Sequence, residues 1–246
     1  MKAVILAAGK GTRMRELTQA MPKPMLAVRG KPILEHIVGG IAAAGIHEFC
    51  IITGWRAEVI EDHFGTGEQF GVSVEYVRQE VQDGTGKAPE LAREFVCNSP
   101  FILTYGDILV ESSAYASMVE SYQSGDFQGA IAVTAGQDVR KGGINLFDAG
   151  FCLEQVVEKP SDEELASLRL SGKIVEDQPV WYNAGIYLFE PNLFECTALL
   201  EKSPRGEYEL TDAINGLLAR NRRLIGVKIA DGWADVRDPE VLKSLK

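Results

Sequence analysis

The sequence contains no apolar run of the roughly 20 residues that a membrane-spanning helix needs. The apolar run at the N-terminus, residues 3–8, is too short for the core of a signal peptide, and Gly-Lys-Gly follows it at once. Internal repeats, low-complexity tracts and linkers rich in Pro, Gly or Ser are also absent. We therefore expect a cytoplasmic protein that does not enter a membrane.

Basic residues are in the minority. Lys and Arg number 25 against 35 Asp and Glu, which gives a formal net charge of −10 at pH 7. An acidic surface repels nucleic-acid backbones and anionic membranes, so neither is expected as a partner. A small phosphate ligand is still allowed, because a local cluster of Arg and Lys can override the net field.

Cysteine and histidine are scarce, and neither shows the spacing of a metal site. The cysteines are Cys50, Cys97, Cys152 and Cys196. They lie far apart in apolar stretches and form no CxxC pair, so we expect each to be a buried free thiol that packs as a small hydrophobe. A disulfide framework and a zinc site are therefore not expected.

What the sequence does contain is an alternation of short apolar runs with helical patterns. Strands are predicted at residues 3–6, 49–53, 73–77, 101–104, 130–134, 153–157, 184–189 and 224–229. A helix is predicted where Ile33, Ile37 and Ile41 recur at helical spacing, with Pro32 in its first turn. Further helices are predicted near residues 118–122, at 162–168 behind a capping box, and at 210–218.

Strands that alternate with helices predict βαβ units and a sheet covered on both faces. The expected fold class is α/β, with a Rossmann-like three-layer α/β/α arrangement around a mixed, mostly parallel sheet. Residues 1–246 are expected to form one domain. The glycine-rich segment 135–150 is expected to form loops over the sheet.

Ligands of open α/β sheets bind at the carboxyl ends of the strands, and the first such end carries the sequence LAAGKGTRM, residues 6–14. Gly9 and Gly11 leave a nearly bare backbone, whose N–H groups can approach phosphate oxygens closely. Arg13 adds a guanidinium fork, and Lys23 adds a second cation in a stiff Pro-Lys-Pro frame. This loop predicts a phosphate site.

Two common phosphate motifs do not fit. A dinucleotide fingerprint needs a third glycine where Met14 stands, which also argues against a nicotinamide dehydrogenase. A Walker A loop fails because Gly86-Lys87 is followed by Ala88, and Val81 stands where the first glycine belongs.

The pair of segments LAAGKGTRM and MPKPML resembles the signature of the sugar-phosphate nucleotidyltransferases, also called nucleotide-sugar pyrophosphorylases. The resemblance implies that the loop wraps the triphosphate of an NTP, while Arg13 and Lys23 neutralise the reacting phosphates. The loop residues placed at the nucleotide in this way are Leu6, Ala8, Gly9, Gly11 and Thr12.

A second segment, RQEVQDGTGKA, follows the third strand. Amides and a tight glycine turn can read the edge of a pyrimidine through donors and acceptors. The segment is similar to the base-recognition loop of N-acetylglucosamine-1-phosphate uridylyltransferases. That likeness places Gln79 on the contact to uracil, and Gly84 and Thr85 beside the base.

Carboxylates and amides follow the later strands. Asp107 ends the segment FILTYGD, where it suits either a Mg²⁺ ligand or a helix N-cap. The family resemblance pairs it with Asp235 as the holders of a catalytic Mg²⁺. It also assigns contacts to the sugar phosphate, and the residues so placed are Gly143, Glu158, Lys159 and Asn183.

The implied reaction is transfer of a nucleoside monophosphate from an NTP to a sugar-1-phosphate. UTP is favoured, then dTTP, with CTP third, and glucose-1-phosphate, N-acetylglucosamine-1-phosphate and phosphocholine are candidate acceptors. A nucleotide-sugar-binding module without turnover is the main alternative, although Arg13, Lys23, Asp107 and Asp235 are all retained. No C-terminal hexapeptide β-helix is expected, and a homo-oligomer is compatible with the sequence.

Three departures from the family pattern leave the acceptor open. Glu16 stands where proline is frequent, Lys87 where small residues or histidine are common, and Arg237-Asp238 where Gly-Thr is frequent.

Overall fold

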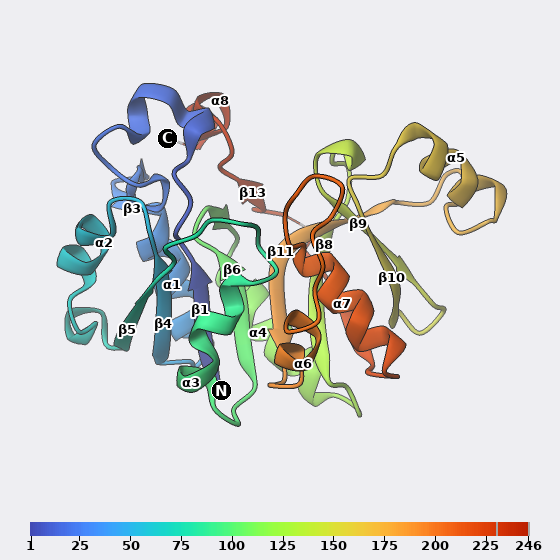
Figure 1. Cartoon of the computed structure of the whole chain (residues 1–246), viewed down its shortest axis with the longest axis horizontal. Coiled ribbons are helices and arrows are strands. Elements are labelled where there is room, and N and C mark those ends of the chain that lie inside the picture. Colours follow the sequence, from blue (N-terminus) through green and yellow to red (C-terminus); the bar gives the residue numbers. More distant parts are fainter. Residues whose placement is uncertain (230, 246) are drawn as a thin grey trace.

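The computed structural model describes residues 1–229 and 231–245, and within them a nine-stranded sheet lies between two layers of helices (Figure 1). Its strands are β1 (Lys2–Leu6), β4 (Glu48–Thr53), β5 (Ser73–Arg78), β6 (Phe101–Tyr105), β8 (Gly129–Thr134), β9 (Gly143–Phe147), β10 (Leu153–Glu158), β11 (Trp181–Phe189) and β12 (Leu224–Lys228). The strand order along the main path is β10-β9-β11-β6-β1-β4-β5, and β8 lies between β11 and β12.

The sheet is mixed. Strands β5, β4, β1 and β6 run parallel, and β12 runs parallel to β8. Strand β11 is antiparallel to both β6 and β8, so it joins the two parallel parts. The expected Rossmann-like α/β class is confirmed.

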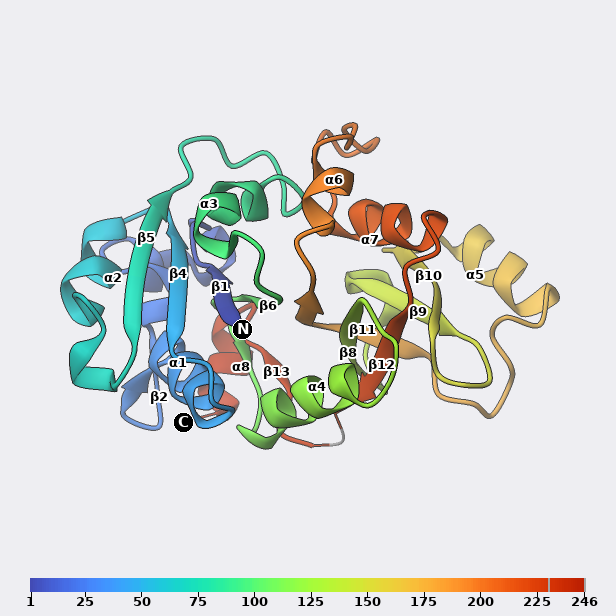
Figure 2. The same cartoon turned by 90° about the horizontal axis from the view of Figure 1, so that it is seen from below.

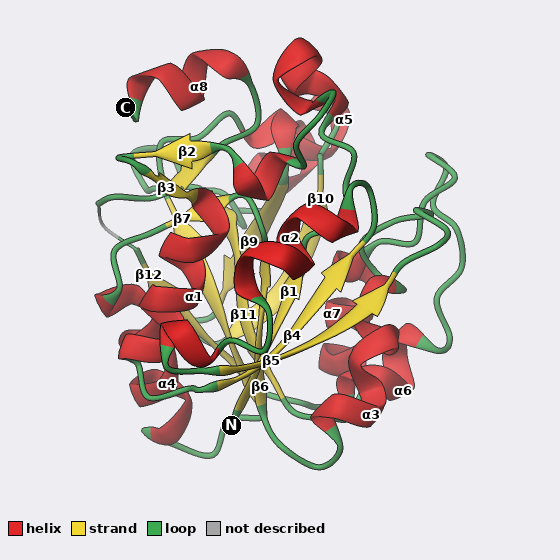
Figure 3. Cartoon of the chain, turned by 90° about the vertical axis from the view of Figure 1, so that its left-hand side faces the viewer, coloured by secondary structure: helices red, strands yellow, loops and turns green. Residues whose placement is uncertain are grey.

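The helices are α1 (Ile33–Ala43), α2 (Ala57–Phe64), α3 (Arg93–Val96), α4 (Ser113–Gln123), α5 (Asp162–Leu170), α6 (Leu193–Thr197), α7 (Leu210–Ala219) and α8 (Pro239–Ser244). Short 3₁₀ helices are η1 (Thr12–Thr18), η2 (Lys23–Met25), η3 (Glu68–Phe70), η4 (Ala88–Ala92) and η5 (Val139–Lys141). Helices α1 and α4 cover one face of the sheet, and α3, α6 and α7 cover the other, as the views of Figure 2 and Figure 3 show.

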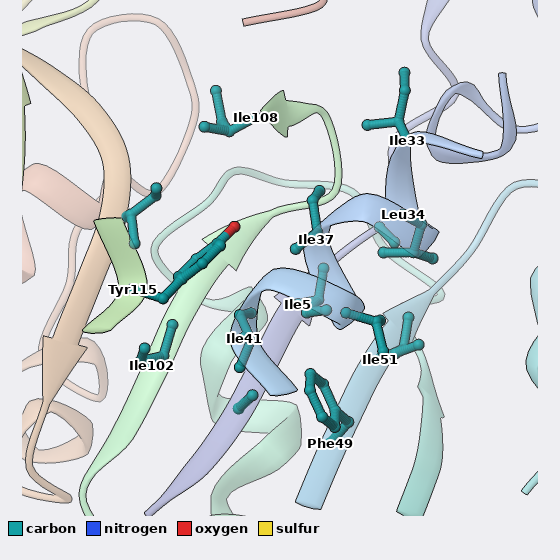
Figure 4. Packing of buried hydrophobic residues seen from close by; sticks show 14 of the residues in the cluster. Ile5, Ile33, Leu34, Ile37, Ile41, Phe49, Ile51, Ile102, Ile108 and Tyr115 are labelled. Carbon is teal, nitrogen blue, oxygen red and sulfur yellow. The ribbon is translucent and has the colours of Figure 1, made fainter. Parts of the chain in front are cut away.

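The alternation of side chains along the strands explains why there are two cores. On β1, Ala3 and Ile5 face the layer of α1, whereas Val4 belongs to the second core beneath α6 and α7. Helix α1 buries its isoleucine stripe against β1 and β4, and Ile37 is 1% exposed there (Figure 4). Both faces of the central strands are therefore dry, as is typical of parallel sheets.

Two small pairings lie outside this sheet. Strand β2 (Ala27–Val28) pairs with β3 (Lys31–Pro32), and β7 (Ile108–Leu109) pairs with β13 (Ala234–Asp235). The second pairing joins the segment just after β6 to a segment near the C-terminus. It positions residues of the site described below.

All of the predicted strands form, and the capping box at Ser161 and Glu164 opens α5 as expected. The prediction of loops over residues 135–150 is wrong at its centre, where β9 pairs with β10 and β11. Ile144 and Leu146 supply the buried apolar positions of that strand, and the surrounding glycines hid them in the sequence. Pro32 ends β3 and is the N-cap residue of α1, so it immediately precedes the first helical turn in which it was expected.

The cysteines are free as expected, but not all are buried. Cys50 and Cys196 are buried, and burial raises the pKa of the Cys50 thiol to about 12. Cys97 is exposed, because it lies just beyond the end of α3 with a positive φ of 52°. Among the described residues, no helix combines the length and the apolar character needed to cross a bilayer.

The buried stripe of α1 makes a stability prediction. Ile37→Ala should lower the free energy of unfolding by about 2–5 kcal/mol, because it opens a cavity under α1 that the packed sheet cannot fill. Urea denaturation followed by circular dichroism measures this. Leu170→Ala, at a side chain that is 90% exposed, is the control and should change stability by less than about 0.5 kcal/mol. An equal effect of the two substitutions would contradict the placement of α1.

Candidate functional site

A cleft with two adjoining cavities lies at the edge of the sheet where β1, β6 and β10 end and where β9 and β11 begin. The loop lobe is lined by residues 6–9 and 11–13 with Gln79, Gln82 and the segment 84–85. The sheet lobe is lined by the ends of β9, β10 and β11 with the segment 205–211. The two lobes share one set of walls, formed by Arg13, Lys23, Thr85, Tyr105, Asp107, Glu207 and Arg237. A ligand that extends from one lobe into the other therefore passes these shared residues.

The first loop presents bare backbone to the loop lobe. Gly11 has a φ of +63°, and a Cβ there would lie 3.0 Å from Cβ of Lys23, so glycine allows the two segments to pack closely. The hydroxyl of Thr18 donates to the carbonyl oxygen of Gly11 at 3.0 Å and fixes the turn. A Cβ on Gly9 would meet no atom within 4 Å, because this part of the loop faces open space. Contacts with Thr18 and Lys23 thus fix the loop at Gly11, while its backbone at Gly9 faces open space.

The second loop, residues 79–86, is tied to the first. Nε2 of Gln82 donates to the carbonyl oxygen of Ala8 at 2.7 Å, so this amide joins the two loops. The segment is also paired with Tyr208, whose N–H donates to Asp83 O at 2.9 Å and whose carbonyl accepts from the N–H of Gly86 at 2.8 Å. Gly84 has a φ of +125°, and a Cβ there would overlap the backbone of Tyr208. The positive φ and the close approach of the Tyr208 backbone both require glycine at this position.

Two carboxylates lie near the junction of the lobes, Asp107 on the shared walls and Asp235 in the sheet lobe. Asp107 follows β6, and Asp235 ends β13 opposite Ile108 of β7. The N–H of Val236 donates to the carbonyl oxygen of Asp107 at 3.0 Å, which locks the two segments together. Burial raises the pKa of Asp235, and the negative charge of Asp107 raises it further, while nearby cations oppose both effects. The two carboxylates are therefore close enough to repel each other.

Each carboxylate has a cationic neighbour. Nζ of Lys23 lies 2.5 Å from Oδ2 of Asp107, and Nε of Arg237 lies 3.4 Å from Oδ2 of Asp235. All four side chains are less than 30% exposed, so solvent screens these pairs less than it screens surface pairs. Arg13 also acts on Asp235 from the loop side.

This donor set fits a divalent cation of the Mg²⁺ type. Carboxylate oxygens are the ligands such an ion prefers, and it keeps several waters when only one or two carboxylates bind it. No group of three or more His, Cys, Asp or Glu residues forms a cage anywhere in the described part of the chain. An ion held by Asp107 and Asp235 would thus take its remaining ligands from water and from a bound phosphate.

The sheet lobe carries an acidic residue between two cations. Oε1 of Glu158 lies 3.8 Å from Nζ of Lys159 and 3.5 Å from a guanidinium nitrogen of Arg205. Burial raises the pKa of Glu158, and the two cations counteract this. Arg205 also pairs with Glu209 at 2.6 Å, so its guanidinium is held at the rim of the lobe.

The floor of the sheet lobe is made by β9 and β11. A Cβ on Gly143 would lie 3.2 Å from Oε2 of Glu158, so a larger residue would crowd that carboxylate. Oδ1 of Asn183 accepts from the N–H of Gly185 at 3.1 Å, which fixes the amide beside Gly143. Burial raises the pKa of Tyr105 to about 12, so its phenol stays neutral between the lobes.

Every residue predicted for the site lines one of the two lobes. The loop lobe holds Leu6, Ala8, Gly9, Gly11, Thr12, Arg13, Lys23, Gln79, Gly84, Thr85 and Asp107. The sheet lobe holds Gly143, Glu158, Lys159, Asn183 and Asp235.

The sequence reading missed two cations of the cleft. Arg205 lies in the segment SPRGEYELTD, to which the sequence analysis assigned no site role. The sequence feature that could have identified Arg205 is its position in a Pro-Arg-Gly segment followed by glutamates. Arg237 was noticed only as a departure from the family pattern, and the structure places it at both lobes.

Comparison with known proteins gives a consistent result. A family profile described as "Nucleotidyl transferase" matches residues 2–244. The low-salt glycan biosynthesis nucleotidyltransferase Agl11 of Haloferax volcanii is 34% identical over 241 residues, which cover 98% of this chain and 63% of that protein. The UTP–glucose-1-phosphate uridylyltransferase AglF of the same organism is 30% identical over 98% of this chain and 93% of its own length.

Among solved structures, a putative glucose-1-phosphate thymidylyltransferase from Bacillus anthracis, in complex with a sucrose, superposes with a TM-score of 0.83. It is 26% identical, and the match covers 100% of this chain and 93% of that one. The chain spans about half to two thirds of the length of the first curated relatives it matches.

The packing of the second loop makes a prediction that separates two glycines of the cleft. Gly84→Ala should lower the free energy of unfolding by about 1–3 kcal/mol, because its Cβ meets the Tyr208 backbone at a positive φ. Gly9→Ala is the matched control, since its methyl group enters open space. Thermal unfolding measures both, and a destabilisation by Gly9→Ala as large as that by Gly84→Ala would refute the loop geometry.

Proposed function

The chain belongs to the nucleotidyl transferase family, and we propose that it transfers a nucleoside monophosphate from an NTP to a sugar-1-phosphate, releasing pyrophosphate. The observation that carries the proposal is the meeting of Asp107, Asp235, Arg13 and Lys23 around the junction of the two lobes. Two substrates bound in separate lobes would have their reacting groups at that junction. We also propose that residues 1–246 act as one nucleotidyltransferase unit.

The loop lobe suits the NTP. Its bare backbone between Leu6 and Thr12 offers N–H groups to phosphate oxygens, and Gly9 leaves the space that a triphosphate needs. Gln79 and the turn at Gly84 and Thr85 form the far wall, where a base would bind. The amide of Gln82 is engaged by Ala8, so Gln79 is the amide we assign to the base edge.

The sheet lobe suits the sugar phosphate. Lys159 and Arg205 are cations at its rim, suited to a phosphate, and Glu158 and Asn183 are acceptors and donors suited to sugar hydroxyls. Gly143 lies on the floor beside Glu158 and Asn183, where its backbone could contact a ring substituent. This arrangement would direct the phosphate of the acceptor toward the shared walls.

The proposed reaction is a displacement at the α-phosphorus of the NTP. A phosphate oxygen of the acceptor forms the new bond to that phosphorus, and the bond to the bridging oxygen of pyrophosphate breaks with its electron pair. The attacking oxygen is already anionic, so no residue has to remove a proton. Arg13 and Lys23 would neutralise the charge that accumulates on the departing pyrophosphate, and positioning supplies the rest.

Asp107 and Asp235 would hold Mg²⁺, which when bound would neutralise phosphate charge and align the reacting oxygens. In this assignment the two aspartates themselves stay ionised. Before the nucleotide binds, Lys23 is bonded to Asp107 and keeps that carboxylate in a fixed orientation.

We infer a pyrimidine nucleotide, with UTP favoured over dTTP and CTP, from Gln79 and the glycine turn. The names of the relatives support this order, because AglF is described as a UTP–glucose-1-phosphate uridylyltransferase and the Bacillus anthracis protein as a putative thymidylyltransferase. Glucose-1-phosphate is the first acceptor to test for the same reason, with N-acetylglucosamine-1-phosphate and phosphocholine next.

A substrate panel tests the proposal directly. The four ribonucleoside triphosphates and dTTP are each combined with the candidate acceptors and Mg²⁺, and pyrophosphate release is measured. We expect the highest kcat/KM with UTP and a sugar-1-phosphate, and loss of activity when EDTA removes the metal. Absence of pyrophosphate release with every pair, at protein concentrations that bind nucleotide, would instead indicate a non-catalytic binding protein.

Substitution of the junction residues should abolish turnover without unfolding the protein. Asp107→Ala, Asp235→Ala and Lys23→Ala are each expected to reduce kcat by at least about 100-fold, because each removes charge stabilisation at the reacting phosphates. Asp162→Ala, which breaks an exposed pair with Arg140, is the matched control and should keep full activity. Near-normal turnover in a folded Asp107→Ala protein would exclude the metal assignment.

A further inference from the structure

Both proposed metal carboxylates are engaged by cations of the protein itself. Lys23 contacts Oδ2 of Asp107 at 2.5 Å, and Arg237 contacts Oδ2 of Asp235 at 3.4 Å. The side chains of Lys23 and Arg237 are only 12% and 19% exposed. Two positive charges thus lie where the charge of a divalent ion would be placed.

Arg237 is held in this position by the backbone on either side of it. Its N–H donates to the carbonyl oxygen of Asp235 at 2.7 Å, which forms a tight turn after the metal carboxylate. The preceding residue, Val236, is fully buried and bonded to Asp107. On the other side, the carboxylate of Asp238 caps α8 through two N–H bonds of 3.0 Å. The backbone at Arg237 is therefore fixed, while its guanidinium contacts Asp235 only through the 3.4 Å pair.

The charges of this cluster constrain the order of binding. A divalent ion that enters between Asp107 and Asp235 is repelled by Lys23 and Arg237 unless these cations move off the carboxylates. Once released, the two cations are still mostly buried and need an anion, because an unpaired charge at such a site is costly. Arg237 lines both lobes, so the phosphates of a bound nucleotide lie within its reach.

We propose that Arg237, together with Lys23, acts as an internal counter-ion that couples divalent-ion binding to nucleotide binding. In the nucleotide-free protein the two cations hold the carboxylates and keep the affinity for the ion low. On binding of the nucleotide they transfer to its phosphates and free the carboxylate oxygens. Since the same free energy couples both events, the ion strengthens nucleotide binding by the same factor. This inference rests on the proposed function.

Binding of Mn²⁺, measured by the electron paramagnetic resonance signal of the free ion, tests the proposal without turnover. In the absence of nucleotide, Arg237→Gln should bind Mn²⁺ about tenfold more tightly than the unaltered protein, because one repelling charge is gone. The ratio of the Mn²⁺ dissociation constants without and with saturating UTP should fall by a similar factor. A residue with a purely structural role would weaken Mn²⁺ binding when replaced.

Two control variants accompany this measurement. Arg237→Lys keeps the charge and should retain the weak, nucleotide-coupled binding of the original protein. Lys31→Gln removes an exposed cation that pairs with Glu35 and should change neither constant, which separates the local charge from the net charge. Circular dichroism establishes that each variant is folded.

The outcomes separate this inference from the proposed function. Unchanged or weaker Mn²⁺ binding by Arg237→Gln would overturn the counter-ion role, while loss of Mn²⁺ binding in Asp235→Asn would still support the metal site. If Asp235→Asn and Asp107→Asn bound Mn²⁺ as the original protein does in the presence of UTP, the metal assignment and the counter-ion role would both be wrong. Tighter Mn²⁺ binding by Arg237→Gln, together with unchanged Mn²⁺ binding by Arg237→Lys, supports the inference.

Discussion

The antiparallel pairing of β7 with β13 is the contact on which the rest of the site depends. It consists of only two residue pairs and one flanking hydrogen bond, yet it brings a segment near the C-terminus against the end of β6. Without it, Asp235 and Arg237 would have no fixed relation to Asp107 and Lys23. The buried side chain of Val236 and the indole of Trp233, which donates to the carbonyl oxygen of Ala184 at 2.8 Å, hold the segment in place from both sides. The hydrophobic core thus fixes the position of the polar cluster that contains Asp235 and Arg237.

The site also shows how an acidic protein can accommodate anionic substrates. The net charge is −10, but the shared walls bring together the side chains of Arg13, Lys23 and Arg237. Two of these cations are balanced by the aspartates, so the cluster is close to neutral before a ligand binds. Neutral balance lowers the cost of burying the charges, and it leaves each cation able to exchange one anionic partner for another. Such a site binds phosphate through local geometry and does not rely on the overall field.

Most of the fold could be predicted from the sequence because it follows local rules, whereas the candidate site residues were placed largely by the resemblance to the sugar-phosphate nucleotidyltransferases. Strong β-forming runs identified the main strands, and the rule that ligands bind at strand ends brought attention to the residues after them. What could not be predicted depends on contacts distant in sequence. Strand β9 was hidden by glycines that serve the floor of the cleft and the turns beside it, and β7 and β13 are too short to give a periodic signal. The partners of Arg205 and Arg237 likewise become visible only when the chain is folded.

The segment from Glu207 to Leu210 links the two lobes physically. The backbone of Tyr208 is bonded on both sides to the loop of Gly84, so the segment forms part of the loop lobe. Its neighbour Glu209 holds Arg205 at the sheet lobe, and the N–H of Leu210 donates to the hydroxyl of Thr85 at 3.4 Å as α7 begins. A displacement of the second loop would therefore move Glu209, the residue after Tyr208, and with it the ion-paired Arg205 of the other lobe. The requirement for glycine at position 84 is, for this reason, a constraint on both lobes of the cleft.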